Sequence, residues 1–219
     1  MKHSKDDIFQ PGSPGGLKII DAVLSFCNFS ANAKIIDVGC GNGRTVRYLR
    51  RKHALDAWGL DKNEQIISLA KEMGESPCFL TADAKVLPFE DTNVNGIFFQ
   101  CSLSKMEEPD SILKETFRVL KPKGFIVVSD FYARTKEALP SGVFGRMEKI
   151  EKQTGRMEIS GFSIRLTRDY SDELETMWGQ MILDHGLDRL RSTLKIDGKS
   201  FSRARYGYCL MIGQKPEKT

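Results

Sequence analysis

The segment 35–43, with the sequence IIDVGCGNG, constrains the fold more than any other part of the chain. A short apolar run ends at an acidic residue, Asp37, and glycines then follow at every second position. A helical pattern begins directly afterwards, at Arg44. The order of strand, glycine turn and helix is typical of a backbone cradle at the carboxyl edge of a parallel strand. Glycine permits a tight turn there, and the missing Cβ lets the backbone approach a ligand closely.

The same alternation of short apolar strands and amphipathic helices runs through the first two thirds of the chain. In chain order the patterns predict helix 17–28, strand 34–38, helix 44–52, strand 55–60, a helix between Asn63 and Gly74, strand 78–82, strand 96–100, helix 110–120 and strand 125–130. Apolar strands that alternate with helices predict a parallel sheet that is covered on both faces. The expected fold class is therefore α/β.

The C-terminal third departs from this alternation. We expect a helix over 143–153, a strand over 162–168, a helix capped by Ser171, a short helix over 187–194 and a last strand over 206–212. The segment 171–194 is thus a helical insert before the last strand. One face of its first helix carries Leu174, Met177, Trp178, Met181 and Ile182, and such a stripe predicts core packing.

The bulk properties indicate a single cytoplasmic domain over residues 1–219. Residues 1–16 are polar and then rich in glycine and proline, which predicts a mobile N-terminal segment that could fold over a bound ligand. The formal net charge of +4 is too mild to indicate a nucleic-acid partner. No apolar run reaches the length of a membrane span, and the five cysteines contain no CxxC pair. We therefore expect no membrane contact, disulfide framework or zinc site.

Three acidic residues lie at or near the ends of three successive predicted strands. Asp61 lies about 22 residues beyond Gly39, and Asp83 lies about 22 residues further on. An acid at the end of the second strand is placed to accept hydrogen bonds from a ribose diol. The third acid can hold an exocyclic amine at an adenine edge. Each acid alone is equally typical of a strand-end cap, but together with Asp37 they predict an adenosine-containing ligand across the strand ends.

In this combination the chain resembles the class I S-adenosylmethionine (SAM)-dependent methyltransferases. The matching motifs are Asp37-Val38-Gly39-Cys40-Gly41-Asn42-Gly43, Gly59-Leu60-Asp61, Ala82-Asp83-Ala84, Leu87-Pro88-Phe89, Asn95-Gly96-Ile97 and Val119-Leu120-Lys121-Pro122-Lys123-Gly124. The likeness covers about residues 17–130 and is closest to the small-molecule branch that includes quinone-biosynthesis enzymes. It implies a Rossmann-like, doubly wound, seven-stranded and mostly parallel sheet, whose last strand runs antiparallel beside the sixth. Lys123 departs from the family, which commonly has glycine there.

The resemblance also implies that SAM is the cofactor and S-adenosylhomocysteine (SAH) the product. Asp37 would reach the methionine amine, and Asp61 would take both ribose hydroxyls, with Lys62 beside the adenine. Asp83 and Ala84 would address the adenine edge, and the backbone of Gln100 and Cys101 would lie near the transferable methyl. The full implied cofactor set is Asp37, Gly39, Cys40, Gly41, Gly43, Asp61, Lys62, Asp83, Ala84, Gln100 and Cys101.

The expected reaction is in-line transfer of the methyl group to a small-molecule acceptor that the sequence does not identify. Positioning of the acceptor accounts for much of such catalysis, and a general base is needed only if the acceptor is protonated. Asp130, Tyr132 and His185 are weak candidates for that base, and we assign none of them. His185 precedes Gly186, which is also typical of an ordinary helix end. We expect no metal, because Asp130 alone does not supply the several oxygen ligands of a metal site.

Other activities fit the residues less well. A nicotinamide-dependent dehydrogenase would show GxGxxG, whereas the spacing here is GxGxG. Methyltransferases that modify nucleic-acid bases carry an Asn/Asp-Pro-Pro-aromatic tetrapeptide where this chain has residues 100–103, QCSL. Arsenite methyltransferases use several cysteines, but Cys40 and Cys101 are also typical of buried small hydrophobes. A SAM-binding sensor or scaffold without transferase activity stays open as the alternative. The exposed side of the insert could serve a homodimer.

Overall fold

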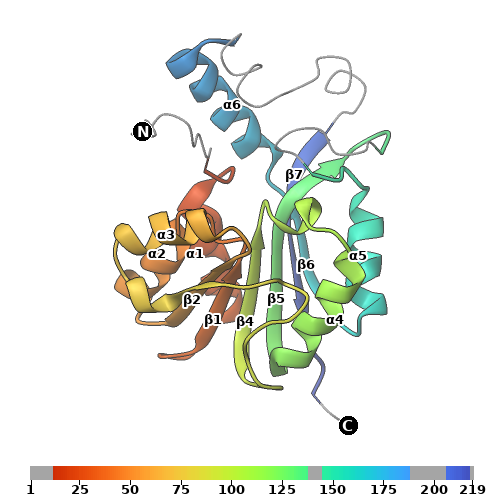
Figure 1. Cartoon of the computed structure of the whole chain (residues 1–219). Helices are drawn as coiled ribbons and strands as arrows, with labels where there is room; N and C mark the ends of the chain where they lie inside the picture. The colour runs from red at the N-terminus through yellow and green to blue at the C-terminus, as the bar shows by residue number, and fades with distance from the viewer. Residues whose placement is uncertain (1–11, 138–144, 188–205, 218–219) are drawn as a thin grey trace.

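The computed structural model describes residues 12–137, 145–187 and 206–217 (Figure 1). Its strands form one seven-stranded sheet in the order β3-β2-β1-β4-β5-β7-β6. The strands are β1 (Lys34–Val38), β2 (Asp56–Asp61), β3 (Phe79–Thr81), β4 (Val94–Gln100), β5 (Leu120–Ala133), β6 (Ser163–Asp169) and β7 (Tyr206–Gln214). The helices are α1 (Gly16–Cys27), α2 (Arg44–His53), α3 (Glu64–Glu72), α4 (Pro109–Val119), α5 (Ile150–Ile159) and α6 (Ser171–His185), with short 3₁₀ turns η1 (Ser76–Cys78) and η2 (Leu103–Lys105).

The sheet has the mostly parallel topology that the sequence predicted. β1 pairs in parallel with β2 and β4, β2 with β3, and β4 with β5. β7 lies between β5 and β6 and is antiparallel to both. Parallel pairing in the observed register, with Val38 opposite Leu60 and Asp61 opposite Thr81, brings the carboxyl ends of β1, β2 and β3 to one edge. The chain therefore has a Rossmann-like, doubly wound α/β fold.

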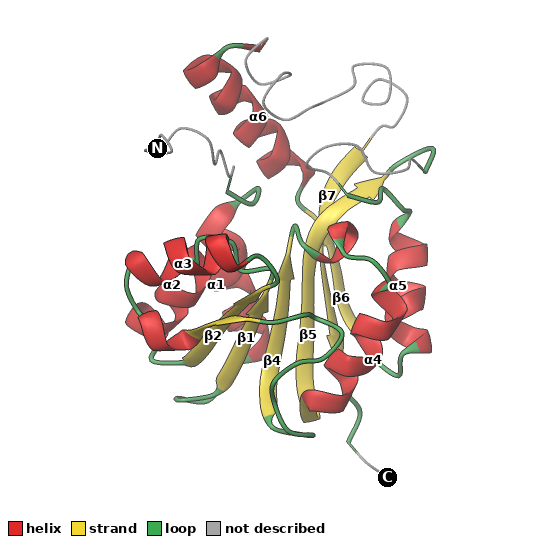
Figure 2. Cartoon of the chain, viewed as in Figure 1, coloured by secondary structure: helices red, strands yellow, loops and turns green. Residues whose placement is uncertain are grey.

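Helices lie on both faces of the sheet (Figure 2), and an apolar cluster joins the helices of each face to the sheet. One cluster joins residues of α1, α2 and α3 to the sheet, and the other joins residues of α4 and α5 to the opposite face. Adjacent strand residues alternate between the clusters, as Phe98 and Phe99 of β4 show, because successive side chains of a strand point to opposite faces. Both phenylalanines are fully buried. None of the described helices is long and apolar enough to cross a membrane.

The predicted helix over 143–153 is wrong in its position, because α5 begins only at Ile150. The preceding residues are held by a contact far away in the sequence. The backbone N–H of Arg146 donates to the Ser104 carbonyl at 2.9 Å, and its guanidinium donates to the Leu103 and Met106 carbonyls. These bonds fix the segment against η2 and leave it outside any helix.

Ser171 is not the cap of α6 but its first residue. The Asp169 carboxylate at the end of β6 accepts hydrogen bonds from the Ser171 N–H at 2.9 Å and from its hydroxyl. Asp169 thus accepts from one backbone N–H of the first turn, in place of a serine cap. The expected short helix over 187–194 lies outside the described residues apart from Leu187.

Lys123 adopts the left-handed backbone conformation that glycine would favour, with φ of 64°. Its backbone N–H donates to the Lys215 carbonyl at 2.9 Å, and its ammonium pairs with Glu217 at 2.8 Å. The departure from the family pattern therefore leaves the turn itself intact. β5 extends from Leu120 through this turn and is longer than the strand that the sequence predicted.

We predict that Gly43→Ala destabilises the fold. Gly43 has φ of 76°, and a Cβ there would lie 2.3 Å from the Phe79 ring. Both effects require a shift of the backbone, so the free energy of unfolding should fall by about 2–4 kcal/mol in urea titration. Gly179→Ala is the matched control, because a Cβ at Gly179 on α6 meets nothing within 4 Å. It should leave stability unchanged or raise it by up to about 1 kcal/mol. Equal effects of both variants would contradict the packing argument.

Candidate functional site

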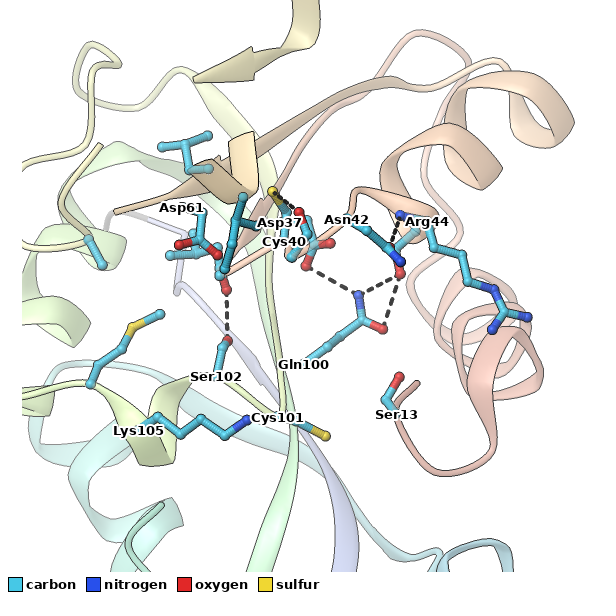
Figure 3. Close-up of a pocket in the computed structure, with 18 of the residues that line it drawn as sticks. Ser13, Asp37, Cys40, Asn42, Arg44, Asp61, Gln100, Cys101, Ser102 and Lys105 are labelled. Carbon is cyan, nitrogen blue, oxygen red and sulfur yellow. Dashed lines mark hydrogen bonds between the residues drawn. The ribbon is translucent and has the colours of Figure 1, made fainter. Parts of the chain in front are cut away.

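A cavity of about 540 Å³ opens at the carboxyl edge of the sheet. Its walls come from the ends of β1, β2 and β4, the loop after β3, the residues before α1, and α6. The predicted cofactor residues that line it are Asp37, Gly39, Cys40, Gly41, Asp61, Lys62, Asp83, Ala84, Gln100 and Cys101. Gly43 does not line the cavity and instead lies at the N-cap of α2. Figure 3 shows how the labelled side chains converge on this space.

The glycine turn after β1 is held by the neighbouring strand. The backbone N–H groups of Gly39 and Cys40 both donate to the Leu60 carbonyl, at 2.7 and 3.0 Å. Gly39 and Gly41 have φ of 75° and 53°, in the left-handed region that favours glycine. A Cβ on Gly39 would lie 2.6 Å from the Ser102 Cβ. Gly39 is therefore required by packing within the protein, in addition to any approach of a ligand.

Asp37 is a buried carboxyl group beside the cavity, with 3% of its surface exposed. Its Oδ1 accepts a hydrogen bond from Gln100 Nε2 at 3.2 Å, and the same amide lies 2.9 Å from the Thr45 hydroxyl (Figure 3). Burial raises the pKa of Asp37 from 3.8 to about 7, the Gln100 bond lowers this pKa, and the charge of Asp61 raises it. A cation bound against Asp37 would compensate the cost of this buried charge.

We predict that Asp37→Asn stabilises the ligand-free protein above neutral pH. The folded state holds the Asp37 proton more tightly than the unfolded chain, so ionisation lowers stability as pH rises from 3.8 to about 7. The variant should gain on the order of 1–3 kcal/mol of unfolding free energy at pH 8 and nothing near pH 4. Urea unfolding at the two pH values measures both. The exposed Asp172 gives the control Asp172→Asn, which should shift stability by less than about 0.5 kcal/mol. A stabilisation independent of pH would rule out the buried charge as its cause.

Asp61 and Asp83 each begin a turn that fixes the carboxylate at the cavity. Asp61 Oδ1 accepts from the Asn63 N–H at 2.9 Å, and Asp83 Oδ1 accepts from the Lys85 N–H at 2.9 Å. Such bonds to the backbone two residues on are typical of aspartate in turns. Asn63 then caps α3 through its own Oδ1, as the sequence predicted. Local turn chemistry thus orients both acids before any ligand binds.

The end of β4 forms the floor of the cavity. The Ser102 hydroxyl donates to the Val38 carbonyl at 2.7 Å, which ties β4 to β1. Cys101 has a left-handed φ of 50°, and its Sγ lies 3.4 Å from the Tyr208 hydroxyl. Burial raises the pKa of the Cys101 thiol to about 12 and that of Cys40 further. Both thiols are therefore neutral at physiological pH, unlike the thiolates that bind soft metals.

The three weak candidates for a general base do not line the cavity. The buried carboxylate of Asp130 accepts hydrogen bonds from the Ser104 N–H, the Ser104 hydroxyl and the Phe131 N–H, each at 2.9 Å. The Tyr132 hydroxyl donates to Asp169 Oδ2 at 2.9 Å. His185 is exposed in the last turn of α6. Asp130 thus holds η2 in place and makes no direct contact with the cavity.

The structure adds cavity residues to which the sequence gave no role in the site. They include Leu17, Thr45, Lys105, Met106 and Phe131, together with Met177 and Trp178 of α6. Ser13 and Pro14 of the N-terminal segment that was expected to fold over a ligand also line the cavity, whereas residues 1–11 lie outside the described residues. Met177 and Trp178 are half-buried and pack against the core, as the stripe predicted, and they also line the cavity. Leu174 and Met181 on the same face are buried as predicted, but the prediction is wrong for Ile182, which is exposed. Helical periodicity identifies the buried face of α6, but it does not distinguish a cavity wall from a core.

Comparison with known proteins agrees with this geometry. Residues 36–128 match the family model described as a methyltransferase domain. The chain is similar to methyltransferase GfsG of Streptomyces halstedii, with 26% identity over 94% of the chain and 82% of the relative. The match at residues 36–128 and the named relative agree with the resemblance to the class I SAM-dependent methyltransferase family that the sequence motifs carry. SAM is the methyl donor of that family, and the quinone-biosynthesis branch stays a prediction.

Two solved structures share the fold. The [4+2]-cyclase SpnF superposes with a TM-score of 0.74 at 23% identity, over 92% of this chain and 81% of the cyclase. Phosphoethanolamine N-methyltransferase 2 of Haemonchus contortus, in complex with phosphomonomethylethanolamine and SAH, superposes with a TM-score of 0.77 at 17% identity. That alignment covers 94% of this chain but only 54% of the Haemonchus protein. The chain thus spans about half the length of that neighbour.

Proposed function

We propose that the chain is an enzyme that transfers the methyl group of SAM to a small-molecule acceptor by in-line displacement. One observation carries this proposal. Parallel pairing of β1, β2 and β3 brings Asp37, Asp61 and Asp83 to a single cavity beside the glycine turn. Carboxylates at these three places match an amine, a ribose diol and an adenine edge, in the order in which an adenosine sulfonium ligand presents them.

The residues present fit this cofactor. The buried Asp37 carboxylate accepts a hydrogen bond from the neutral amide of Gln100. A bound ammonium group would add a positive charge that offsets the cost of burying the ionised carboxylate. Gly41 lines the cavity with a left-handed backbone, which a residue with a Cβ adopts only under strain. Asp61 and Asp83 are held by their turns with carboxylates at the cavity edge.

SAM supplies a methyl group on a positively charged sulfur, which makes that carbon electrophilic. The chain must then hold an acceptor in line and exclude water, and such positioning can supply much of the acceleration. Pro14, Leu17, Phe131, Met177 and Trp178 line the side of the cavity away from β2 and β3 with apolar surface. We propose that these residues enclose the acceptor. No general base is assigned to this reaction.

A reducing compartment, the cytoplasm, fits the five free cysteines of the chain, four of which are buried. The fold itself supports more than one chemistry, so transfer has to be measured apart from binding. A homodimer through the exposed side of α6 stays a prediction.

We predict that Asp61→Ala weakens SAM binding by on the order of 1.5–3 kcal/mol, because two hydrogen bonds to the ribose diol would be lost. Calorimetric titration with SAM and with SAH measures the change. Glu64→Ala is the matched control. It removes the same charge three residues after Asp61, and the Glu64 side chain does not line the cavity. Unchanged affinity in Asp61→Ala, or an equal loss in both variants, would contradict the proposed role of Asp61.

The activity test follows SAH formation from SAM with a panel of small acceptors. Binding of SAM and SAH in the micromolar range, about −8 kcal/mol, with SAH formation that depends on the acceptor, would support methyl transfer. Binding without turnover across the panel would favour the sensor or scaffold. No binding of either ligand to a sample shown to be folded would overturn the proposed function.

A further inference from the structure

The cavity has two chemically different halves. The acidic half lies at the ends of β1, β2 and β3, where Asp37, Asp61 and Asp83 line it. The apolar half is lined by residues at the start of α1, at the end of β5 and on α6: Pro14, Leu17, Phe131, Met177 and Trp178. The two ends of this wall lie close together, because a Cβ added to Gly15 would lie 3.4 Å from Glu173 Cγ of α6.

Lys105 supplies a positive charge on the floor between these halves. Its side chain extends from η2 toward Cys101 (Figure 3). Burial raises the pKa of the Cys101 thiol and of the Asp130 carboxyl, and the charge of Lys105 opposes both shifts. Within the described part of the chain, the Lys105 ammonium forms no ion pair. Asp130 does not neutralise it by direct contact, because its oxygens accept bonds from Ser104 and Phe131.

The turn that carries Lys105 is rigidly anchored. Asp130 accepts two bonds from Ser104, and the Arg146 guanidinium donates to the carbonyls of Leu103 and Met106 on either side. Glu107, the acidic residue that follows, also lines the cavity, but its charge acts on Lys85 near Asp83. Lys105 is therefore the charged side chain of the cavity lining that acts on Cys101, while Asp130, which does not line the cavity, acts on the same thiol in the opposite sense.

We propose that the acceptor is an apolar, ring-bearing molecule that presents an ionised oxygen, such as a phenolate, enolate or carboxylate, to Lys105. This inference rests on the proposed function, in which Cys101 lies beside the transferable methyl. The acceptor oxygen forms a bond to the methyl carbon as the sulfur–carbon bond breaks, and that electron pair stays on the sulfur. The negative oxygen becomes a neutral ether or ester, the sulfonium becomes a thioether, and no proton has to leave. A general base is then unnecessary.

The same charge disfavours an amine acceptor. An ammonium group beside Cys101 would face both Lys105 and the positive sulfur of the cofactor, and like charges at short range are repulsive. The acidic residues that could compensate it lie in the other half of the cavity. The Haemonchus neighbour is named for an amine acceptor, so this inference separates the chain from that neighbour in substrate class.

The test compares three probes of similar shape and different charge on the SAH-loaded protein: 2-naphthoate, 2-naphthamide and 2-naphthylmethylammonium. Calorimetry should show that 2-naphthoate binds at least tenfold more tightly than the amide and more tightly still than the ammonium. Lys105→Met should remove the preference for the acid, and Lys105→Arg should restore it. Lys52→Met is the control, because Lys52 is exposed in the last turn of α2 and does not line the cavity.

Several results would overturn the inference. Equal binding of acid and amide, tighter binding of the ammonium, or no binding of 2-naphthoate to the SAH-loaded protein would each exclude an anionic acceptor at Lys105. A preference that survives in Lys105→Met would exclude Lys105 as its source. SAH binding in the same samples distinguishes failure of this inference from failure of the proposed function. If SAH binds and the preference is missing, only this inference fails, whereas loss of SAH binding removes the proposed function as well.

Discussion

The site depends on one buried carboxyl group, that of Asp37, where β1 gives way to the glycine turn. Burial raises its pKa to about 7, because the site disfavours the ionised form, so above neutral pH the ligand-free protein carries an unfavourable buried charge. Gln100 reaches it from the end of β4 with a single hydrogen bond. Active sites commonly hold such unfavourable groups, because a charge held ready for a ligand does not have to be reoriented when the ligand binds. Asp37 therefore links the stability of the fold directly to binding of a cation.

The acidic half of the cavity could be predicted from sequence, because most of its side chains are positioned by residues close to them in the chain. The strand-end acid Asp61 and the cap at Asn63 each depend on residues within a few positions of one another. The glycine turn is also recognisable from its own sequence, although its N–H groups bind the Leu60 carbonyl of the next strand. Parallel pairing then needs only the right strand order to bring these segments to one edge. The same reasoning predicted the strands, because their apolar patterns are continuous. The antiparallel direction of the last strand was implied by the resemblance to the methyltransferases and not by the pattern itself.

The errors at the start of α5 and at the cap of α6 arose where distant segments decide the local structure. Arg146 binds carbonyls about 40 residues earlier in the chain and so keeps its own segment out of α5. Asp169 takes the capping role that the sequence pattern gave to Ser171. Met177 and Trp178 share a helix face with buried residues, yet the position of α6 above the sheet edge places them at the cavity. Helical periodicity predicts which face of a helix points into the protein, but it does not predict whether that face packs in the core or lines a cavity.

The apolar half of the cavity, where we place the acceptor, could not be predicted from sequence because distant segments build it. Its floor rests on the η2 turn, which has no sequence signature and is held by Asp130 from β5 and by Arg146 from the segment before α5. Asp130 thus affects the acceptor through the position of Lys105, although no atom of Asp130 lines the cavity. Substitutions in these anchoring residues would move Lys105 and the cavity floor while leaving the strand-end acids in place. Specificity for the acceptor can therefore change without a change in the cofactor motifs, as expected for a fold that supports many reactions on one cofactor site.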